Sequence, residues 1–164
     1  MLVPYYAVFV EKVGGDILEA GLAAGVYAVV AGFATLIAGK WGDRAARKEF
    51  LVGGAYLAIA LCFVAYIFVN SIWELLIVQA VLGLAQAVYV PAYDALYTAH
   101  LGGQRMASSR WSLWEASSFF AIAVGAVVGA LIVHYMSFTG LLIAMAGLCI
   151  ISGIYLFTLP RKAV

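Results

Sequence analysis

The sequence predicts an all-α integral membrane protein with five full transmembrane helices and the end of one more. Three observations support this. Of the 164 residues, 66% are hydrophobic and only 10% are charged, which is too apolar for a water-soluble fold of this length. Five apolar stretches reach about 20 residues, the length that a helix needs to cross a bilayer. The Lys and Arg residues gather in alternate loops.

One transmembrane domain is expected over residues 1–164. It opens with a short apolar piece at 2–10, too short to cross a bilayer, which we interpret as the outer end of a first helix. Soluble core helices are shorter and carry a polar stripe, so a soluble fold is disfavoured. The full spans are expected at 17–39, 50–69, 72–97, 111–134 and 138–159.

The positive charges predict the orientation of these spans. Lys12 lies alone among the loops of one side, and the eight other Lys and Arg residues fall on the opposite side. Cytoplasmic loops are enriched in Lys and Arg, so we expect a multi-pass protein of the inner (plasma) membrane with its basic loops and C-terminus in the cytoplasm. Topology control alone accounts for most of these charges. The eight residues are Lys40, Arg44, Arg47, Lys48, Arg105, Arg110, Arg161 and Lys162.

Nothing in the sequence indicates catalytic chemistry. Cys62 and Cys149 lie in different spans without the spacing of metal ligands, which is typical of free buried thiols. His100 and His134 fall at opposite faces of the membrane and cannot share a metal. No nucleophile–base pair, phosphate-binding loop or nucleic-acid-binding patch is present. We therefore expect no enzyme activity, no metal, no cofactor and no nucleic-acid partner.

A short internal repeat indicates how the helices are organised. Residues 4–6 (Pro-Tyr-Tyr) precede Gly14-Gly15, and residues 91–93 (Pro-Ala-Tyr) precede Gly102-Gly103, at an offset of about 87 residues. Three spans separate the copies, and an odd number of crossings inverts the second copy. Such 3+3 inverted repeats are typical of secondary transporters, with chance similarity between apolar helices as the alternative. The same offset places the start of the first unit before Met1, so we expect most of the first helix to be missing.

A charged segment at 39–48 separates the first two full spans. It resembles the loop between the second and third helices of the major facilitator superfamily, whose pattern is Gly-x-Leu-x-Asp-Arg-x-Gly-Arg-Lys with an apolar residue three positions later. Trp41 replaces the leucine and Ala46 the second glycine. The resemblance implies a half-size, six-helix member, an MFS-like half bundle lacking most of its first helix. The matching positions are Gly39, Asp43, Arg44, Arg47, Lys48 and Leu51.

The resemblance also implies a cytoplasmic gate in which Asp43, Arg47 and Asp94 form a charge cluster. Asp43 and Arg47 are one helical turn apart, and Asp94 lies at the cytoplasmic end of its span. Carboxylates near a membrane need partners or water, so such a cluster can hold the inner gate closed. The alternative is a static salt bridge that anchors helix ends. The predicted cluster also contains the rest of the motif, Gly39, Arg44 and Lys48.

Polar side chains along the span 72–97 indicate a candidate substrate cavity. Gln79, Gln86 and Tyr93 recur every seven residues and so share one helix face. Amides and a phenol can bind a solute in a water-filled cavity, or they can bond to neighbouring helices. Because these groups are uncharged, they favour a neutral or weakly polar solute.

Glu115 is a candidate proton or gate site. It lies about one turn into its span, near the depth expected for Asp94, and two carboxylates close together raise the pKa of one of them. Trp111 and Trp114, beside it, are expected to be interfacial anchors. The alternative is that Glu115 forms an ion pair with a basic residue, namely Arg44, Arg105 or Arg110.

The resemblance implies transmembrane transport of a small solute by alternating access, with a homodimer in the bilayer supplying both halves of the cavity. Two departures weaken a proton-coupled or antiport mechanism. Gln79 stands where proton-coupled members often carry arginine, and the glycines at 125 and 129 lack the proline of the antiporter pattern. The alternative function is a non-transporting membrane interaction or assembly subunit that keeps the half fold and has a heteromeric partner.

Overall fold

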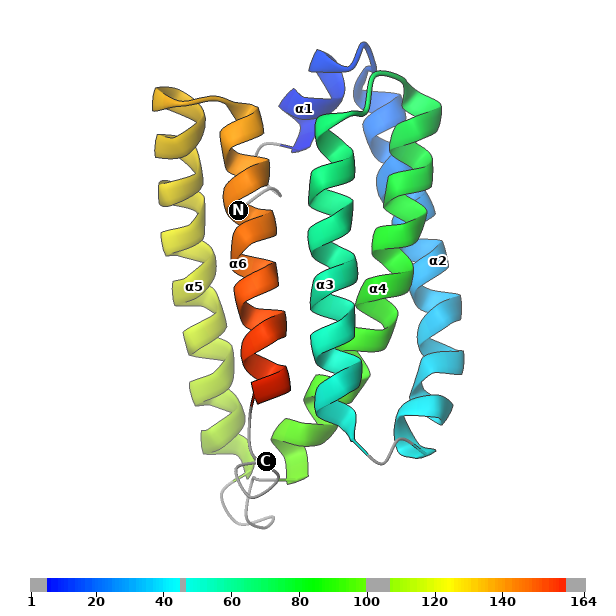
Figure 1. The fold of residues 1–164 in the computed structure, drawn as a ribbon, viewed down its shortest axis with the longest axis vertical. Helices are drawn as coiled ribbons and strands as arrows, with labels where there is room; N and C mark the ends of the chain where they lie inside the picture. The colour runs from blue at the N-terminus through cyan, green and yellow to red at the C-terminus, as the bar shows by residue number, and fades with distance from the viewer. Residues whose placement is uncertain (1–5, 45–46, 100–106, 159–164) are drawn as a thin grey trace.

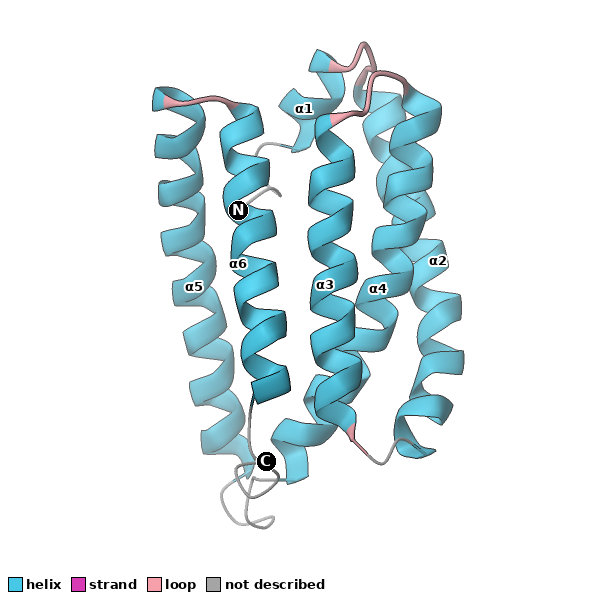
Figure 2. Cartoon of the chain, viewed as in Figure 1, coloured by secondary structure: helices cyan, strands magenta, loops and turns pink. Residues whose placement is uncertain are grey.

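The computed structural model describes residues 6–44, 47–99 and 107–158, which form six helices and no strand (Figures 1 and 2). This confirms the all-α fold class. Five of these helices are long and apolar enough to cross a membrane. The helices are α1 (Tyr6–Lys12), α2 (Ile17–Arg44), α3 (Lys48–Ile67), α4 (Ile72–Ala99), α5 (Ala107–Tyr135) and α6 (Phe138–Thr158).

The helices alternate in direction, so their ends gather at two levels (Figure 1). The turns between α1 and α2, α3 and α4, and α5 and α6 lie together at one end. At the other end α2 gives way to α3, and α4 finishes near the start of α5. The described basic residues of this second end are Lys40, Arg44, Arg47, Lys48 and Arg110, so we call it the basic end.

The charged segment is more helical than the sequence suggested. The first full span was expected to end at residue 39, yet α2 continues to Arg44, and α3 begins at Lys48 rather than at residue 50. Gly42 is the only strong helix breaker between residues 40 and 44, and it does not stop the helix. Arg47 has an extended backbone (φ −142°, ψ 92°) and is the N-cap residue of α3.

A tight turn joins α1 to α2. Gly14 has φ +87°, which favours glycine, and the Gly15 N–H donates to the Val10 carbonyl oxygen at 3.0 Å, closing α1. The Asp16 carboxylate then accepts the Glu19 N–H at 3.2 Å, and the Glu19 carboxylate accepts the Asp16 N–H at 2.9 Å. Hydrogen bonding, chiefly with the Glu19 side chain, lowers the pKa of Asp16 from its ordinary value. The first full span therefore starts at a well-defined residue.

α4 is the central helix of the bundle. It packs along α2 on one side and α3 on another, and α3 also packs along α6. The main backbone contacts of α5 are with α6. Near the end opposite the basic end, the Phe9 ring meets Tyr66 edge-on at 5.4 Å between ring centroids and stacks on Phe138 at 5.3 Å. This aromatic contact joins α1, α3 and α6 in the buried core.

Glycine permits the closest helix crossings. A Cβ at Gly83 would lie 2.8 Å from the Tyr27 carbonyl oxygen, so α4 and α2 meet there in backbone contact. A Cβ at Gly53 would lie 3.2 Å from the Gly153 carbonyl oxygen, which marks the crossing of α3 and α6.

Large apolar side chains cover the outside of the bundle. Phe33 on α2 is 70% exposed, Phe120 on α5 is 73% exposed and Ile151 on α6 is 66% exposed. Soluble monomers rarely expose apolar surface on this scale. A bilayer, in contrast, is a solvent that such side chains prefer to water.

We predict that Gly83→Ala destabilises the protein. The added Cβ would approach a backbone oxygen of α2, which cannot move without shifting the helix. Overpacking of this kind costs about 1–3 kcal/mol of unfolding free energy. Gly54→Ala is the matched control, because a Cβ there meets nothing within 4 Å. Titration with sodium dodecyl sulfate, followed by circular dichroism, measures both variants, and equal stability would contradict this crossing.

Candidate functional site

The charged motif lies at the junction of α2 and α3, at the basic end. Gly39 lies in the last two turns of α2, and a Cβ there would meet nothing within 4 Å. The Arg47 guanidinium lies 3.9 Å from the centroid of the Phe50 ring, a cation–π contact. The remaining motif side chains, those of Asp43, Arg44 and Lys48, lie outside the described part of the structure.

Asp94 lies in the last two turns of α4, at the same end of the bundle. Its side chain is exposed, and it makes no ion pair within 4 Å with Arg47 or any other described residue. Of the predicted gate cluster, the described side chains of Arg47 and Asp94 therefore have separate surroundings in this geometry.

The three residues of the predicted cavity stripe have different environments. Gln79 is only 5% exposed, and its side-chain amide donates a hydrogen bond to the Tyr6 hydroxyl of α1. Gln86 is half-buried and has no hydrogen-bond partner among the described side chains. Tyr93 packs against other aromatic rings. Gln79 thus links two helices, whereas Gln86 keeps its hydrogen-bonding groups available.

Aromatic rings from α4 and α5 meet near the basic end. The Trp114 ring lies 5.1 Å from both Tyr93 and Tyr97, measured between centroids, and Trp111 lies 5.3 Å from Tyr97. Tyr89 continues the series at 5.7 Å from Tyr93. We call these five residues the aromatic cluster. It joins two helices whose main backbone contacts are made elsewhere.

Hydrogen bonds extend the aromatic cluster at both sides. The Tyr97 hydroxyl donates to the Arg110 carbonyl oxygen at 2.8 Å. The Tyr56 hydroxyl of α3 donates to that of Tyr89 at 3.3 Å, and the two rings meet at 5.1 Å. The spacing of these residues was a usable signal for the cluster, because tyrosines four residues apart on α4 face tryptophans three residues apart on α5.

Glu115 follows Trp114 in α5 and has an exposed side chain. It forms no ion pair with a described residue, Arg110 included. Arg105, another of its expected partners, lies outside the described residues, as does the side chain of Arg44. Glu115 and Asp94 are therefore two exposed carboxylates, each next in sequence to a member of the aromatic cluster.

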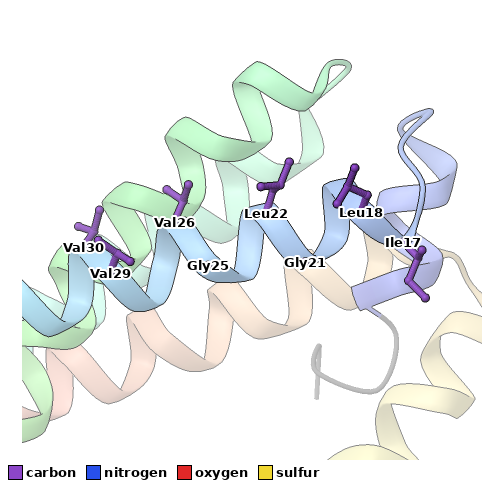
Figure 3. A pocket seen from close by; sticks show the side chains of 8 residues that line it. All are labelled: Ile17, Leu18, Gly21, Leu22, Gly25, Val26, Val29 and Val30. Carbon is purple, nitrogen blue, oxygen red and sulfur yellow. The ribbon is translucent and has the colours of Figure 1, made fainter.

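The glycine face of α2 forms a shallow apolar groove of about 520 Å³ (Figure 3). Added Cβ atoms at Gly21 or Gly25 would meet nothing within 4 Å, so no described helix occupies this face. Smooth faces of this kind allow another membrane helix to approach closely. The groove is lined by Ile17, Leu18, Gly21, Leu22, Gly25, Val26, Val29 and Val30.

The sequence pattern of the Major Facilitator Superfamily matches residues 1–164. The chain is also similar to the Multidrug resistance protein MdtG of Salmonella typhimurium and to the protein of the same name from Citrobacter koseri. Each is 24% identical over 165 residues, which cover 98% of this chain and 40% of the relative. The chain thus spans about two fifths of the length of these relatives. No solved structure matches it.

We predict that Gln79 and Tyr6 are energetically coupled. In a double-mutant cycle of Gln79→Leu and Tyr6→Phe, the coupling should be about 0.6–1.7 kcal/mol, as for other hydrogen bonds between membrane helices. Unfolding in sodium dodecyl sulfate measures it. A cycle of Gln86→Leu with Tyr6→Phe is the control and should be additive, because Gln86 does not bond to Tyr6. Additive effects in the first cycle would mean that this hydrogen bond does not join α1 to α4.

Proposed function

The chain belongs to the major facilitator superfamily, and from this premise we propose that it moves a small solute across the membrane by alternating access. The observation that carries the proposal is the family match over the whole chain. The charged motif between α2 and α3 supports it, because it occupies the expected junction of two spans. Membership of this family supports a transporter rather than an enzyme.

Six helices supply half of a transport pathway, so the proposal requires a second half. We propose a homodimer, with the two copies related by an axis along the membrane normal. Two features of the chain support a partner: the open glycine groove of α2 and the limited packing of α5. A 3+3 inverted repeat relates α1–α3 to α4–α6 in this proposal, and both α1 and α4 end next to a glycine-containing connection.

The gate is placed at the basic end, which we propose to be cytoplasmic together with the C-terminus. Gly39 and the charged residues after it lie at the end of α2 and the start of α3. Both helices pack on α4, and α3 also packs on α6. When the halves rock, a charge pair across this junction can form or break. We assign the present geometry, with Arg47 on Phe50 and apart from Asp94, to the released state of the gate cluster.

The first test is the oligomeric state. We expect light scattering of the protein in mild detergent to give the protein mass of a dimer. Gly25→Leu should fill the α2 groove and shift the protein toward monomer by at least about tenfold in dissociation constant, roughly 1.4 kcal/mol. Gly54→Leu on α3 is the control, because its Cβ also meets nothing within 4 Å. A wild-type monomer that captures a different membrane protein would favour the assembly-subunit function instead.

The second test concerns the gate. Gln86→Cys provides a probe in a background where Cys62 and Cys149 are replaced by alanine. We expect Asp43→Ala to increase labelling of this probe by a membrane-impermeant thiol reagent applied from the cytoplasmic side of inverted vesicles. The increase follows because the gate loses a carboxylate that holds it closed. Glu11→Ala, at the opposite end, should leave labelling unchanged, and unchanged labelling in both variants would rule out the gate.

A further inference from the structure

We propose that the apolar groove between α3 and α4 at the basic end binds one acyl chain of an anionic phospholipid, whose phosphate group lies at Arg47 and the start of α3. We call it the basic-end groove. This site goes beyond the proposed transport function and does not depend on it. It lies in the bilayer leaflet at the basic end and distinguishes lipids by the charge of their headgroups.

The basic-end groove has a volume of about 400 Å³ and is lined by apolar residues of both helices. Small residues of α3 leave room in it, since a Cβ at Gly54 would meet nothing within 4 Å. Larger side chains also line it, among them Phe50, which is 40% exposed, and Leu84, which is 51% exposed. Because this lining is both exposed and apolar, it favours a hydrocarbon occupant.

The groove fits the depth of one leaflet. Its α3 residues run from Phe50 to Ala58, a rise of about 12 Å along the helix. Half of a bilayer core is about 15 Å thick. The groove therefore begins at the basic end and stops near the middle of the membrane, which matches an acyl chain of the leaflet at that end.

Arg47 provides positive charge at the basic end of the groove. Its guanidinium lies 3.9 Å from the centroid of the Phe50 ring, and Phe50 lines the groove. The Arg47 Nε atom is buried and has no hydrogen-bond partner in the described part of the chain. A buried donor without an acceptor is destabilising, and a charged acceptor such as a phosphate oxygen removes that penalty.

The start of α3 adds hydrogen-bond donors at the same place. The first N–H groups of a helix have no partner within it, and they attract anionic oxygens. Arg47 is the N-cap residue, and no side-chain hydrogen bond caps the helix. The acidic residue nearby, Glu49, precedes Gly53 by four residues, so it shares the helix face that crosses α6 rather than the groove face.

A second groove between the same two helices provides an internal comparison. It lies at the opposite end, has the same volume of about 400 Å³ and is also mostly apolar. Its charged lining residue is Glu74, whose carboxylate accepts the Asn70 N–H at 2.8 Å. This carboxylate repels a phosphate, whereas Arg47 attracts one. The two grooves match in volume and differ in charge, so an anionic phospholipid should prefer the basic-end groove.

The test is native mass spectrometry of the full chain in a neutral detergent, titrated with phosphatidylglycerol or phosphatidylcholine of identical acyl chains. We expect one phosphatidylglycerol to bind more tightly than phosphatidylcholine. Arg47→Gln should weaken phosphatidylglycerol binding by about fivefold, the effect of one basic residue near a membrane surface, and should leave phosphatidylcholine binding unchanged. Lys40→Gln removes the same charge from α2 at the same end, outside the groove, and should have less than about half that effect.

A second pair of variants tests the apolar part of the site. Gly54→Leu fills the basic-end groove and should abolish the preference for phosphatidylglycerol. Ala65→Leu is the matched control, because it makes a similar change on the same helix in the groove of Glu74 and should leave that preference intact. Circular dichroism checks the fold of each variant, and the Arg47→Gln comparison decides the matter if Gly54→Leu does not fold.

Four outcomes would overturn the site. Equal binding of the two lipids would remove the role of charge, and equal effects of Arg47→Gln and Lys40→Gln would show only general attraction to the basic end. Competition by glycerol 3-phosphate, which has the charge without the acyl chains, would indicate a site for free anions. A shift of Gly54→Leu toward monomer with phosphatidylglycerol binding retained would place a second copy of the chain in the groove.

Discussion

The bilayer core offers no water to hydrogen-bond with the backbone, and the rest of this structure follows from that constraint. Each span must satisfy its own N–H and C=O groups, so the chain crosses only as helices. Hydrophobic burial cannot draw these helices together, since lipid is as apolar as they are, and contact depends on close approach and on a few polar bonds. Close approach occurs at Gly83 and at the Gly53–Gly153 crossing, and the hydrogen bond between Gln79 and Tyr6 is a polar bond between helices.

These contacts converge on α4. It meets α2 through Gly83, α1 through Gln79 and α3 through Tyr89, and it reaches α5 through Tyr93 and Tyr97. The residues follow one another along the helix from the turn with α3 toward the basic end (Figure 1). A single helix therefore contacts α1 and α2 through its first half and α3 and α5 through the aromatic residues of its second half.

Local composition was sufficient to predict the spans, because a bilayer selects for about 20 apolar residues in a row. It was harder to predict which side chains contact one another between helices. Gln79 was a cavity candidate because its helix face could be derived, but its bond to Tyr6 depends on a contact 73 residues distant in sequence. Trp114 was expected at the lipid interface because most tryptophans at span ends lie there, and only the crossing of α4 toward α5 shows its tyrosine neighbours. The expected pairing of Arg47 with Asp94 came from the family motif and depends on Asp43, whose side chain lies outside the described residues.

The arrangement of α5 has a mechanical consequence. A two-residue turn holds its far end to α6, and the aromatic cluster holds its other end to α4, while its long middle section has few contacts within the chain. α5 is therefore held to the rest of the chain near its two ends and only weakly between them. Loss of the aromatic contacts alone would leave α5 attached at its turn with α6, so the two ends of α5 depend on different interactions.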